Sequence, residues 1–395
     1  MAEPAIQFNP INVEPIDIQS KYKLPTTLQY CRKCVMSNQR PRIVFDDEGI
    51  CNACRYWERK DATINWQARE LQLQDLCNRF RRTDGRYDVI VPSSGGKDSA
   101  YVAHLLKFKY NMNPLTVTWA PHVYTEIGWQ NFQALINSGL DNILATPNGI
   151  VHRKLTRLCT VEMGDPFQPF IYGQVSYPIQ AALNYDVHLV MDGENGEAEY
   201  GGDPASEEKP GFQVEDVDSY WFSGLPVDYW HDHGFSRADL YPYQPPEVGK
   251  KKIERHFFSY YKDWRPQKHY YYCAEHTGFK ANPEGRSEGT YSKYASLDDK
   301  IDPFHHYFSL LKFGYARATG DAAHEIREGL ITREEGVALV RRYDAEFPDK
   351  NYQLFLDYCG FSEQEFWDVC DRWRNLNLWE KAAGEWRLKQ QVDNV

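Results

Sequence analysis

One short loop constrains the fold of this chain more than any other feature. Residues 93–99, Ser-Ser-Gly-Gly-Lys-Asp-Ser, follow an apolar run at 87–92 and precede an apolar helical pattern at 100–108. A loop between a strand and a helix places the first N–H groups of the helix at the end of the strand, where they bind anions. The two glycines let the backbone approach an anion closely, and the serine hydroxyls add donors. The loop therefore predicts a phosphate site.

This loop differs from two other phosphate-binding motifs. A Walker A loop needs glycine at position 91 and serine or threonine at position 98, where this chain has Val91 and Asp98. The glycines also lack the spacing of the dinucleotide fingerprint. An ordinary glycine turn capped by serine remains the alternative interpretation.

Strands and helices alternate along the first half of the chain. Short apolar runs that are typical of buried strands have helical patterns between them. This alternation predicts an α/β fold, with a doubly wound, mostly parallel sheet and helices on both faces. In such folds a ligand lies at the carboxyl ends of the strands. The expected strands are 87–92, 115–120, 142–146 and 187–191, and the expected helices are 66–82, 100–108, 126–138, 151–163 and 174–185.

Composition and pattern divide the chain into parts. The first residues carry prolines and no periodicity, and a long aromatic-rich segment matches neither the strand nor the helix period. The C-terminal part is helical, and Thr332 and Ser362, each followed three residues later by glutamate, fit the capping box. The predicted parts are an extended arm (1–28), a cysteine segment (29–60), the sheet domain (61–300) with a substrate-side insertion near 203–280, and a helical subdomain (301–395).

Four of the nine cysteines form two close pairs. Cys31 and Cys34 enclose two residues, Cys51 and Cys54 enclose two more, and sixteen residues separate the pairs. Each such turn presents two thiolates to one ion, and two turns complete a tetrahedral zinc site of the zinc-ribbon type. We expect a structural Zn²⁺, because four thiolates leave no position for a substrate. Two redox-active or adventitious pairs are the alternative.

The overall charge argues against nucleic acid as a partner. Lys and Arg number 45 and Asp and Glu 56, which gives a net charge of −11, whereas proteins that bind phosphate backbones are usually basic. No apolar stretch reaches the roughly 18 residues of a membrane helix, and the first residues lack the features of a signal peptide. The other five cysteines are scattered singly, which favours reduced thiols and a cytoplasmic protein.

Two charged segments have both a functional and a plain interpretation. Glu194, Asn195 and Glu197 follow the fourth expected strand, where they would contact a metal or substrate at the sheet edge. A solvated acidic turn is the alternative. The lysines at 250–252 would contact an anionic sugar nucleotide, or they would simply form part of the solvent-exposed surface.

The loop resembles the Ser-Gly-Gly-x-Asp-Ser signature of the PP-loop ATP pyrophosphatases. The closer resemblance is to the N-acetyl sugar amidotransferases of bacterial surface-glycan biosynthesis, the WbpG/PseA-like family. It spans about 29–345 and rests on the paired cysteines upstream of the loop, on Asp-Gly-Glu-Asn-Gly-Glu-Ala-Glu-Tyr-Gly-Gly at 192–202, and on Gly-Arg-Ser-Glu-Gly-Thr-Tyr-Ser-Lys-Tyr-Ala-Ser-Leu-Asp-Asp-Lys at 285–300.

The resemblance implies a fold, a reaction and a set of site residues. The fold is that of the HUP-like adenine nucleotide alpha hydrolases. ATP adenylates the oxygen of an acetamido group, pyrophosphate leaves into the loop, and ammonia displaces AMP to give an acetamidino sugar of a lipopolysaccharide, O-antigen or nonulosonic acid. The implied catalytic residues are Lys97, Asp98 (on Mg²⁺), Glu194, Arg286 and Lys300, and the ATP-binding residues are Ser94, Gly95, Gly96, Lys97, Ser99, Trp119 (facing adenine) and Lys293. The alternatives are that Asp98 is a helix-start carboxylate favoured by the helix dipole and that Trp119 only packs in the core.

The chain shows no glutaminase of its own. An N-terminal-nucleophile glutaminase would need cysteine at position 2, where this chain has Ala2, and no single cysteine lies in a Gly-x-Cys-x-Gly elbow. The resemblance implies that ammonia comes from a separate glutaminase with a cyclase-like barrel subunit, similar to the two halves of imidazole glycerol phosphate synthase.

Two other functions fit parts of the sequence. A PP-loop tRNA-thiolating enzyme would also carry paired cysteines, but it would need a basic face and a catalytic thiol near the loop. A non-catalytic ATP-binding scaffold would use the cysteine segment for assembly. The net charge disfavours the first, and the intact loop disfavours the second.

Overall fold

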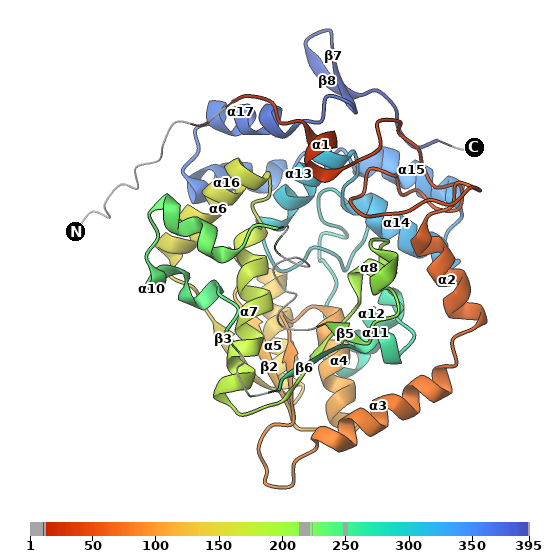
Figure 1. The fold of residues 1–395 in the computed structure, drawn as a ribbon, viewed down its shortest axis with the longest axis vertical. Helices are drawn as coiled ribbons and strands as arrows, with labels where there is room; N and C mark the ends of the chain where they lie inside the picture. Colours follow the sequence, from red (N-terminus) through yellow and green to blue (C-terminus); the bar gives the residue numbers. More distant parts are fainter. Residues whose placement is uncertain (1–10, 12, 213–221, 223, 248–251, 394–395) are drawn as a thin grey trace.

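A six-stranded sheet lies at the centre of the fold (Figure 1). The structure is a computed structural model that describes residues 11, 13–212, 222, 224–247 and 252–393. The strand order is β3-β2-β1-β4-β6-β5, and all neighbours run parallel except the antiparallel pair β5 and β6. The expected α/β fold with a mostly parallel sheet is confirmed. The strands are β1 (Val89–Pro92), β2 (Pro114–Trp119), β3 (Asp141–Ala145), β4 (Leu189–Asp192), β5 (Gly211–Phe212) and β6 (Glu254–Phe257).

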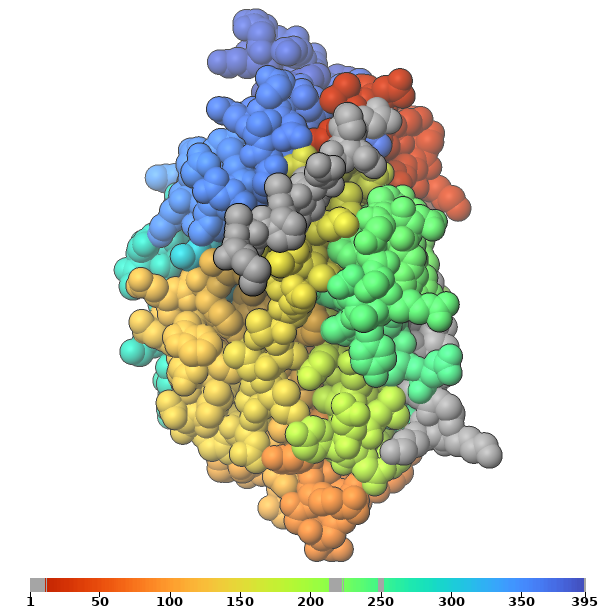
Figure 2. Space-filling view, turned by 90° about the vertical axis from the view of Figure 1, so that its left-hand side faces the viewer, coloured from red at the N-terminus to blue at the C-terminus, as the bar shows by residue number. Residues whose placement is uncertain are grey.

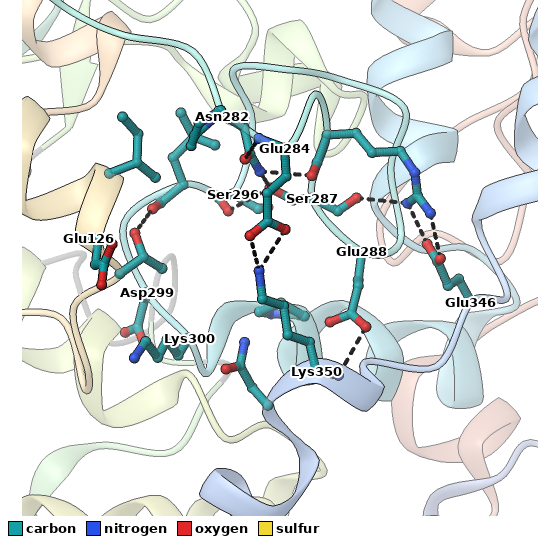
Figure 3. A pocket seen from close by; sticks show the side chains of 17 residues that line it. Glu126, Asn282, Glu284, Ser287, Glu288, Ser296, Asp299, Lys300, Glu346 and Lys350 are labelled. Carbon is teal, nitrogen blue, oxygen red and sulfur yellow. Dashed lines mark hydrogen bonds and ion pairs between the residues drawn. The ribbon is translucent and has the colours of Figure 1, made fainter.

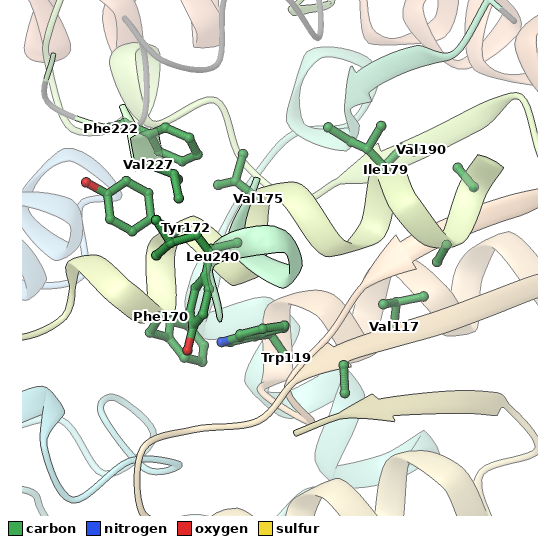
Figure 4. Packing of buried hydrophobic residues seen from close by; sticks show 14 of the residues in the cluster. Val117, Trp119, Phe170, Tyr172, Val175, Ile179, Val190, Phe222, Val227 and Leu240 are labelled. Carbon is green, nitrogen blue, oxygen red and sulfur yellow. The ribbon is translucent and has the colours of Figure 1, made fainter. Parts of the chain in front are cut away.

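Helices cover both faces of this sheet because alternate residues of each strand point to opposite sides. Ile90 of β1 packs with the helices α6 and α7 on one face, whereas Val89 and Val91 pack with α3 and α4 on the other. Figure 4 shows part of the first layer, where Ile179 lies beside Val190 of β4. The helices of both layers are α3 (Trp66–Phe80), α4 (Lys97–Phe108), α5 (Glu126–Asn137), α6 (Gly149–Met163), α7 (Gln168–Asn184), α11 (Phe258–Tyr261) and α12 (Pro266–His276).

Two strands of the sheet come from the segment 203–280, where the sequence predicted none. The buried guanidinium of Arg255 in β6 pairs with the carboxylate of Asp192 in β4, at 2.5 and 2.8 Å. A four-residue strand with a buried ion pair gives no apolar run, so its sequence does not indicate a strand. The other elements near this segment are α8 (Gly196–Glu199), η1 (Pro204–Ser206), η3 (Val227–His233), α10 (Arg237–Leu240) and η4 (Tyr241–Tyr243).

The C-terminal part is helical, as predicted, and forms one end of the molecule beyond the sheet (Figures 1 and 2). Both capping boxes are present, at Thr332 with Glu335 and at Ser362 with Glu365. A terminal two-stranded hairpin was not predicted. The elements are α13 (Asp302–Phe313), α14 (Arg317–Arg327), α15 (Arg333–Tyr343), η5 (Asp349–Asn351), α16 (Tyr352–Cys359), α17 (Glu363–Trp373), β7 (Trp379–Ala382) and β8 (Glu385–Leu388).

The N-terminal residues pack on this helical part. The predicted extended arm contains a short helix, α1 (Ile18–Tyr22), whose first turn is capped by Asp17. Ile18 and Leu24 are buried against α13, α16 and α17. Residues 1–10 and 12 of the arm lie outside the described residues, as do the predicted lysines at 250 and 251. The cysteine segment continues into α2 (Asn52–Ala62).

The length and apolar character of a helix decide whether it could span a membrane. Among the described residues, none of the helices has both the length and the apolar character that crossing a bilayer requires. The proposed boundaries between the four parts of the chain remain a prediction.

The glycine loop lies directly against the backbone of α5. Gly95 has φ +92°, and a Cβ atom there would lie 2.6 Å from Cα of Phe132. Gly85 has φ +81°, but a Cβ atom there would meet nothing within 4 Å. Only the first position therefore combines the left-handed backbone with a close approach.

We expect Gly95→Ala to destabilise the protein more than Gly85→Ala. The left-handed conformation costs each alanine about 1–2 kcal/mol. Displacing α5 adds about 1–3 kcal/mol at Gly95 alone. Chemical denaturation of both variants and the wild type measures the difference, and equal losses would contradict the close packing of the loop on α5.

Candidate functional site

The four paired cysteines lie close together in a buried cluster. Their Sγ atoms all lie within 4.8 Å of one another, with Cys31 and Cys54 3.9 Å apart and Cys34 and Cys51 3.8 Å apart. A tetrahedron of sulfurs around Zn²⁺, at about 2.3 Å each, has edges of about 3.8 Å. These separations exceed the S–S bond of a disulfide, about 2.05 Å, so all four thiols are free. The cluster can therefore hold one metal ion such as zinc.

Backbone groups and two arginines surround this cluster. The N–H groups of Lys33, Cys34 and Cys51 donate to the Cys31 Sγ at 3.4 Å, which favours the thiolate form. The guanidinium of Arg333 in α15 donates to the carbonyl oxygens of Cys31 and Cys34. The Arg327 guanidinium at the end of α14 lies beside the cluster, where its positive charge interacts with Cys34, Cys51 and Cys54. The C-terminal helices thus hold the cysteine segment in place.

The glycine loop begins directly after β1 and ends at the first turn of α4. Gly96 precedes the helix as its N-cap, so the unpaired N–H groups of the first turn face outward at the carboxyl end of the sheet. The Ser93 hydroxyl donates to the Ser99 hydroxyl at 2.8 Å, and the Ser99 hydroxyl in turn bonds the Gly96 carbonyl. The loop lines a cavity of about 310 Å³, which we call the loop cavity. Ser94, Gly95, Gly96, Lys97 and Asp98 all line it.

A network of charged side chains holds Lys97 and Asp98. The Lys97 ammonium lies 2.5 Å from one oxygen of Asp98, and Nδ1 of His269 in α12 lies 2.9 Å from the other. Burial opposes ionisation of Asp98, but the Lys97 and His269 contacts outweigh it and lower its pKa. His269 itself is buried and stacks on Tyr101 of α4. The sequence pointed to Lys97 and Asp98, whereas His269 is too far along the chain to be recognised from it.

Three further carboxylates lie near these groups. Burial and the nearby Asp98 charge raise the pKa of Glu194 to about 7. Burial and the neighbouring Asp302 charge raise the pKa of Asp298 to about 6, although a hydrogen bond from Ser94 acts to lower it. Asp298 and Asp302 both line the loop cavity. Carboxylates beside a phosphate site suit Mg²⁺, which binds one or two carboxylates together with phosphate oxygens.

Arg317 supplies a second cation to the loop cavity. It is the first residue of α14, lines the cavity and pairs with Asp321 one turn along, at 3.1 Å. The further cations that the family resemblance implied for the site, Arg286, Lys293 and Lys300, all lie in the stretch 285–300. Arg317 lies outside that stretch, and no sequence motif marks it, so only the tertiary structure brings it to the loop.

Several residues implied by the resemblance lie away from the loop cavity. Trp119 is buried in the core against Gly173, and its ring neighbours include Tyr177 and Tyr243 (Figure 4). Lys293 is exposed and lies over the rings of Tyr270 and Tyr271, outside the cavity lining.

Arg286 and Lys300 line a second cavity of about 670 Å³, which we call the side cavity (Figure 3). Arg286 forms a bidentate ion pair with Glu346 there, with both distances 2.7 Å. The structure therefore brings Ser94, Gly95, Gly96, Lys97 and Asp98 together in the lining of the loop cavity, with the Glu194 carboxyl near Asp98 and Lys97. Ser99 supports the loop through the Gly96 carbonyl and does not line the cavity. Trp119, Arg286, Lys293 and Lys300 lie elsewhere.

Asn195 and Glu197 have structural contacts. The Asn195 side chain caps α8, and its amide donates to the Ser206 carbonyl at 2.7 Å. The Glu197 carboxylate pairs with Arg42 of the cysteine segment and accepts the Asp203 N–H. These contacts join the loop after β4 to the cysteine segment, which favours a positioning role for both residues.

Comparison with known proteins supports the family resemblance for the end of the chain. A family model described as the C-terminal domain of LPS biosynthesis protein WbpG-like matches residues 288–393, which include Arg317 and exclude the glycine loop. This match confirms the WbpG-like resemblance over those residues. An uncharacterised protein of Methanocaldococcus jannaschii is 28% identical over 88 residues, which are 22% of this chain. The aligned segment spans 31% of that protein, about a third of its length.

We expect the purified protein to contain about one zinc ion per chain, because the thiol geometry fits one tetrahedral ion. Cys54→Ala should lose the metal and unfold at a lower temperature. Cys77→Ala, which changes a buried cysteine of α3, should keep it. Elemental analysis and thermal unfolding measure both effects, and equal metal content in the two variants would contradict a four-cysteine site.

Glu194 should make the stability of the protein depend on pH. Its pKa is about 7 in the folded protein against 4.5 as the ordinary value, so between these values the folded state binds more protons. The free energy of unfolding therefore falls as the pH rises through this range. Glu194→Gln removes this contribution and should give a shallower slope between pH 5 and pH 8.

Thermal or chemical unfolding across that pH range measures the slope. Glu275→Gln changes a carboxylate of α12 that is 78% exposed and should leave the slope as in the wild type. An unchanged slope in Glu194→Gln would show that the Glu194 carboxyl titrates normally.

Proposed function

We propose that this chain is an ATP-dependent amidotransferase of surface-glycan biosynthesis that converts the N-acetyl group of a sugar into an acetamidino group. One observation carries the proposal: the Ser-Gly-Gly-Lys-Asp-Ser loop follows the central strand β1 and opens on a cavity with two cations, Lys97 and Arg317. The WbpG-like match of residues 288–393 supports the link to glycan biosynthesis.

The reaction requires the amide oxygen to become a leaving group. The acetamido oxygen attacks the α-phosphorus of ATP, and the bond to the β-phosphate breaks, so that pyrophosphate leaves. Ammonia then adds to the imidate carbon and AMP departs with the original amide oxygen. The products are the amidine, AMP and pyrophosphate, with a proton released by the attacking ammonia.

The loop residues bind the departing pyrophosphate in this proposal. The first N–H groups of α4 and the hydroxyl of Ser94 donate to the outer phosphates. The Ser99 hydroxyl, which donates to the Gly96 carbonyl, holds the loop in its shape. Lys97 and Arg317 oppose the charge that develops as the pyrophosphate leaves the loop cavity. Mg²⁺, when bound beside Asp98 and Asp298, supplies further charge neutralisation. Glu194, with its raised pKa, is suited to accept the proton released from ammonia.

Ammonia is delivered by a separate glutaminase with a cyclase-like barrel subunit in this proposal. It rests on the family resemblance and on the absence of a glutaminase motif in the sequence. The acceptor is an N-acetylated sugar nucleotide or nonulosonic acid.

The alternative function, tRNA thiolation, needs a reactive thiol beside the loop. Cys273 in α12 lies nearest, since its Sγ donates to the Lys97 carbonyl at 3.1 Å. Burial raises the pKa of Cys273 to about 12, which opposes formation of the thiolate nucleophile. The amidotransferase is therefore the better supported function.

An isotope experiment tests the amidotransferase directly. The protein is incubated with ATP, Mg²⁺, ammonium and an N-acetylated sugar whose acetyl oxygen is ¹⁸O. We expect AMP and pyrophosphate to form only with the sugar, and the ¹⁸O to appear in AMP. AMP formation that does not depend on any tested sugar nucleotide or nonulosonic acid would contradict the proposal.

Arg317→Met should lower kcat/KM for ATP by about 10²- to 10³-fold, because a preorganised donor to the phosphates is lost. Arg342→Met makes the same change on the exposed side of α15 and should leave the rate unchanged. Similar losses in both variants would indicate a general effect on stability.

A further inference from the structure

The side cavity adjoins the loop cavity. Ser296, Leu297 and Asp299 line both, so one short segment separates the two spaces. At about 670 Å³ the side cavity lies within the range of small-molecule sites, and it is larger than the loop cavity of about 310 Å³. A molecule in the side cavity therefore lies next to one bound at the glycine loop.

The walls of the side cavity are fixed by interactions within the protein. Nδ2 of Asn282 donates to the Arg286 carbonyl at 2.7 Å, and the Ser287 hydroxyl lies 3.1 Å from the Ser296 carbonyl. The Glu346 carboxylate, held by Arg286, also accepts the Gly289 N–H at 2.8 Å. These bonds shape the segment 282–296 before any ligand arrives, which reduces the ordering cost of binding.

Polar groups dominate the lining. Carboxylates, amides and hydroxyls project from the loop before α5 and its first turn, from the segment 282–300 and from the residues up to the end of η5 (Figure 3). Such groups accept and donate hydrogen bonds to sugar hydroxyls in several directions. The lining therefore favours a polyhydroxylated ligand over an apolar one.

One cation of the cavity has no carboxylate partner. Arg286 pairs with Glu346, and Lys350 pairs with Glu284 at 2.5 Å. Asp299 accepts from the His122 ring at 2.8 Å and is therefore engaged. Among the described residues, the Lys300 ammonium has no ion pair or hydrogen bond, and Figure 3 draws none.

We infer that the side cavity binds the sugar acceptor and that Lys300 binds an anionic group of that sugar, a carboxylate or a phosphate. This inference rests on the proposed function, in which the acetamido oxygen must reach the α-phosphorus of ATP. A sugar in the side cavity meets that need, since only the segment 296–299 separates it from the nucleotide. Lys300 then determines specificity for the acceptor rather than contacting ATP.

Lys300→Met tests this assignment. Because its side chain has no described polar partner, the variant is expected to fold like the wild type. The probes are N-acetylneuraminate, which carries a carboxylate, N-acetylglucosamine 1-phosphate, and neutral N-acetylglucosamine. We expect Lys300→Met to weaken binding of the favoured anionic probe about 10- to 100-fold, the effect of losing one charged hydrogen bond.

Binding of the neutral probe and of a non-hydrolysable ATP analogue should change little in Lys300→Met. Titration calorimetry measures all these affinities. Lys381→Met in the distant strand β7 is the matched control and should bind every probe as the wild type does. Preference for the carboxylate probe would indicate a sugar acid, and preference for the phosphate probe a sugar phosphate.

Two results would overturn the inference. One is an anionic affinity that Lys300→Met leaves unchanged, and the other is failure of both anionic probes to bind the wild type. Lys300-dependent binding of an anionic sugar without any sugar-dependent AMP would instead overturn the proposed reaction and keep the binding site. Sugar-dependent AMP formation that Lys300→Met leaves unchanged would support the proposed reaction and overturn the role of Lys300 in binding the sugar.

Discussion

The carboxylate of Asp299 joins the two halves of this molecule. One oxygen accepts the N–H and the ring Nδ1 of His122, and the other accepts the N–H groups of Val123 and Ile301. Both side chains are buried, so these bonds form away from competing water. These bonds attach the segment that precedes α13 to the loop that follows β2. The segment that separates the two cavities depends on this attachment, and the position of α13 depends on it as well.

The sequence predicted features that arise from local patterns. The loop at 93–99, the parallel strands around it and both capping boxes depend on residues a few positions apart, and all are present. The clustering of the four cysteines also follows from their spacing, because each pair encloses a single tight turn. These features need no knowledge of the rest of the chain.

The missed features depend on residues that are distant in the sequence. Strand β6 is stabilised by the pairing of Arg255 with Asp192, and neither residue suggests a buried strand by itself. His269 and Arg317 reach the loop only because α12 packs on α4 and α14 begins beside the cavity. The position of Arg286 in a glycine-rich stretch suggested a contact with phosphate. Instead, Arg286 pairs with Glu346, which lies sixty residues later in the sequence. Partners of this kind cannot be identified from one sequence.

Helix α14 connects two sites, because each of its ends carries an arginine that reaches one of them. Arg317 begins it beside the loop cavity, and Arg327 ends it against the thiol cluster. Eleven residues make a rigid rod of about 15 Å, and the Arg327 guanidinium also donates to the Glu199 carbonyl at 2.6 Å. The cysteine cluster, which can hold a metal ion, therefore anchors the far end of the helix that places Arg317 in the lining of the loop cavity. A change in the spacing of the four thiols would in this way be passed along one helix to the lining of a cavity at its other end.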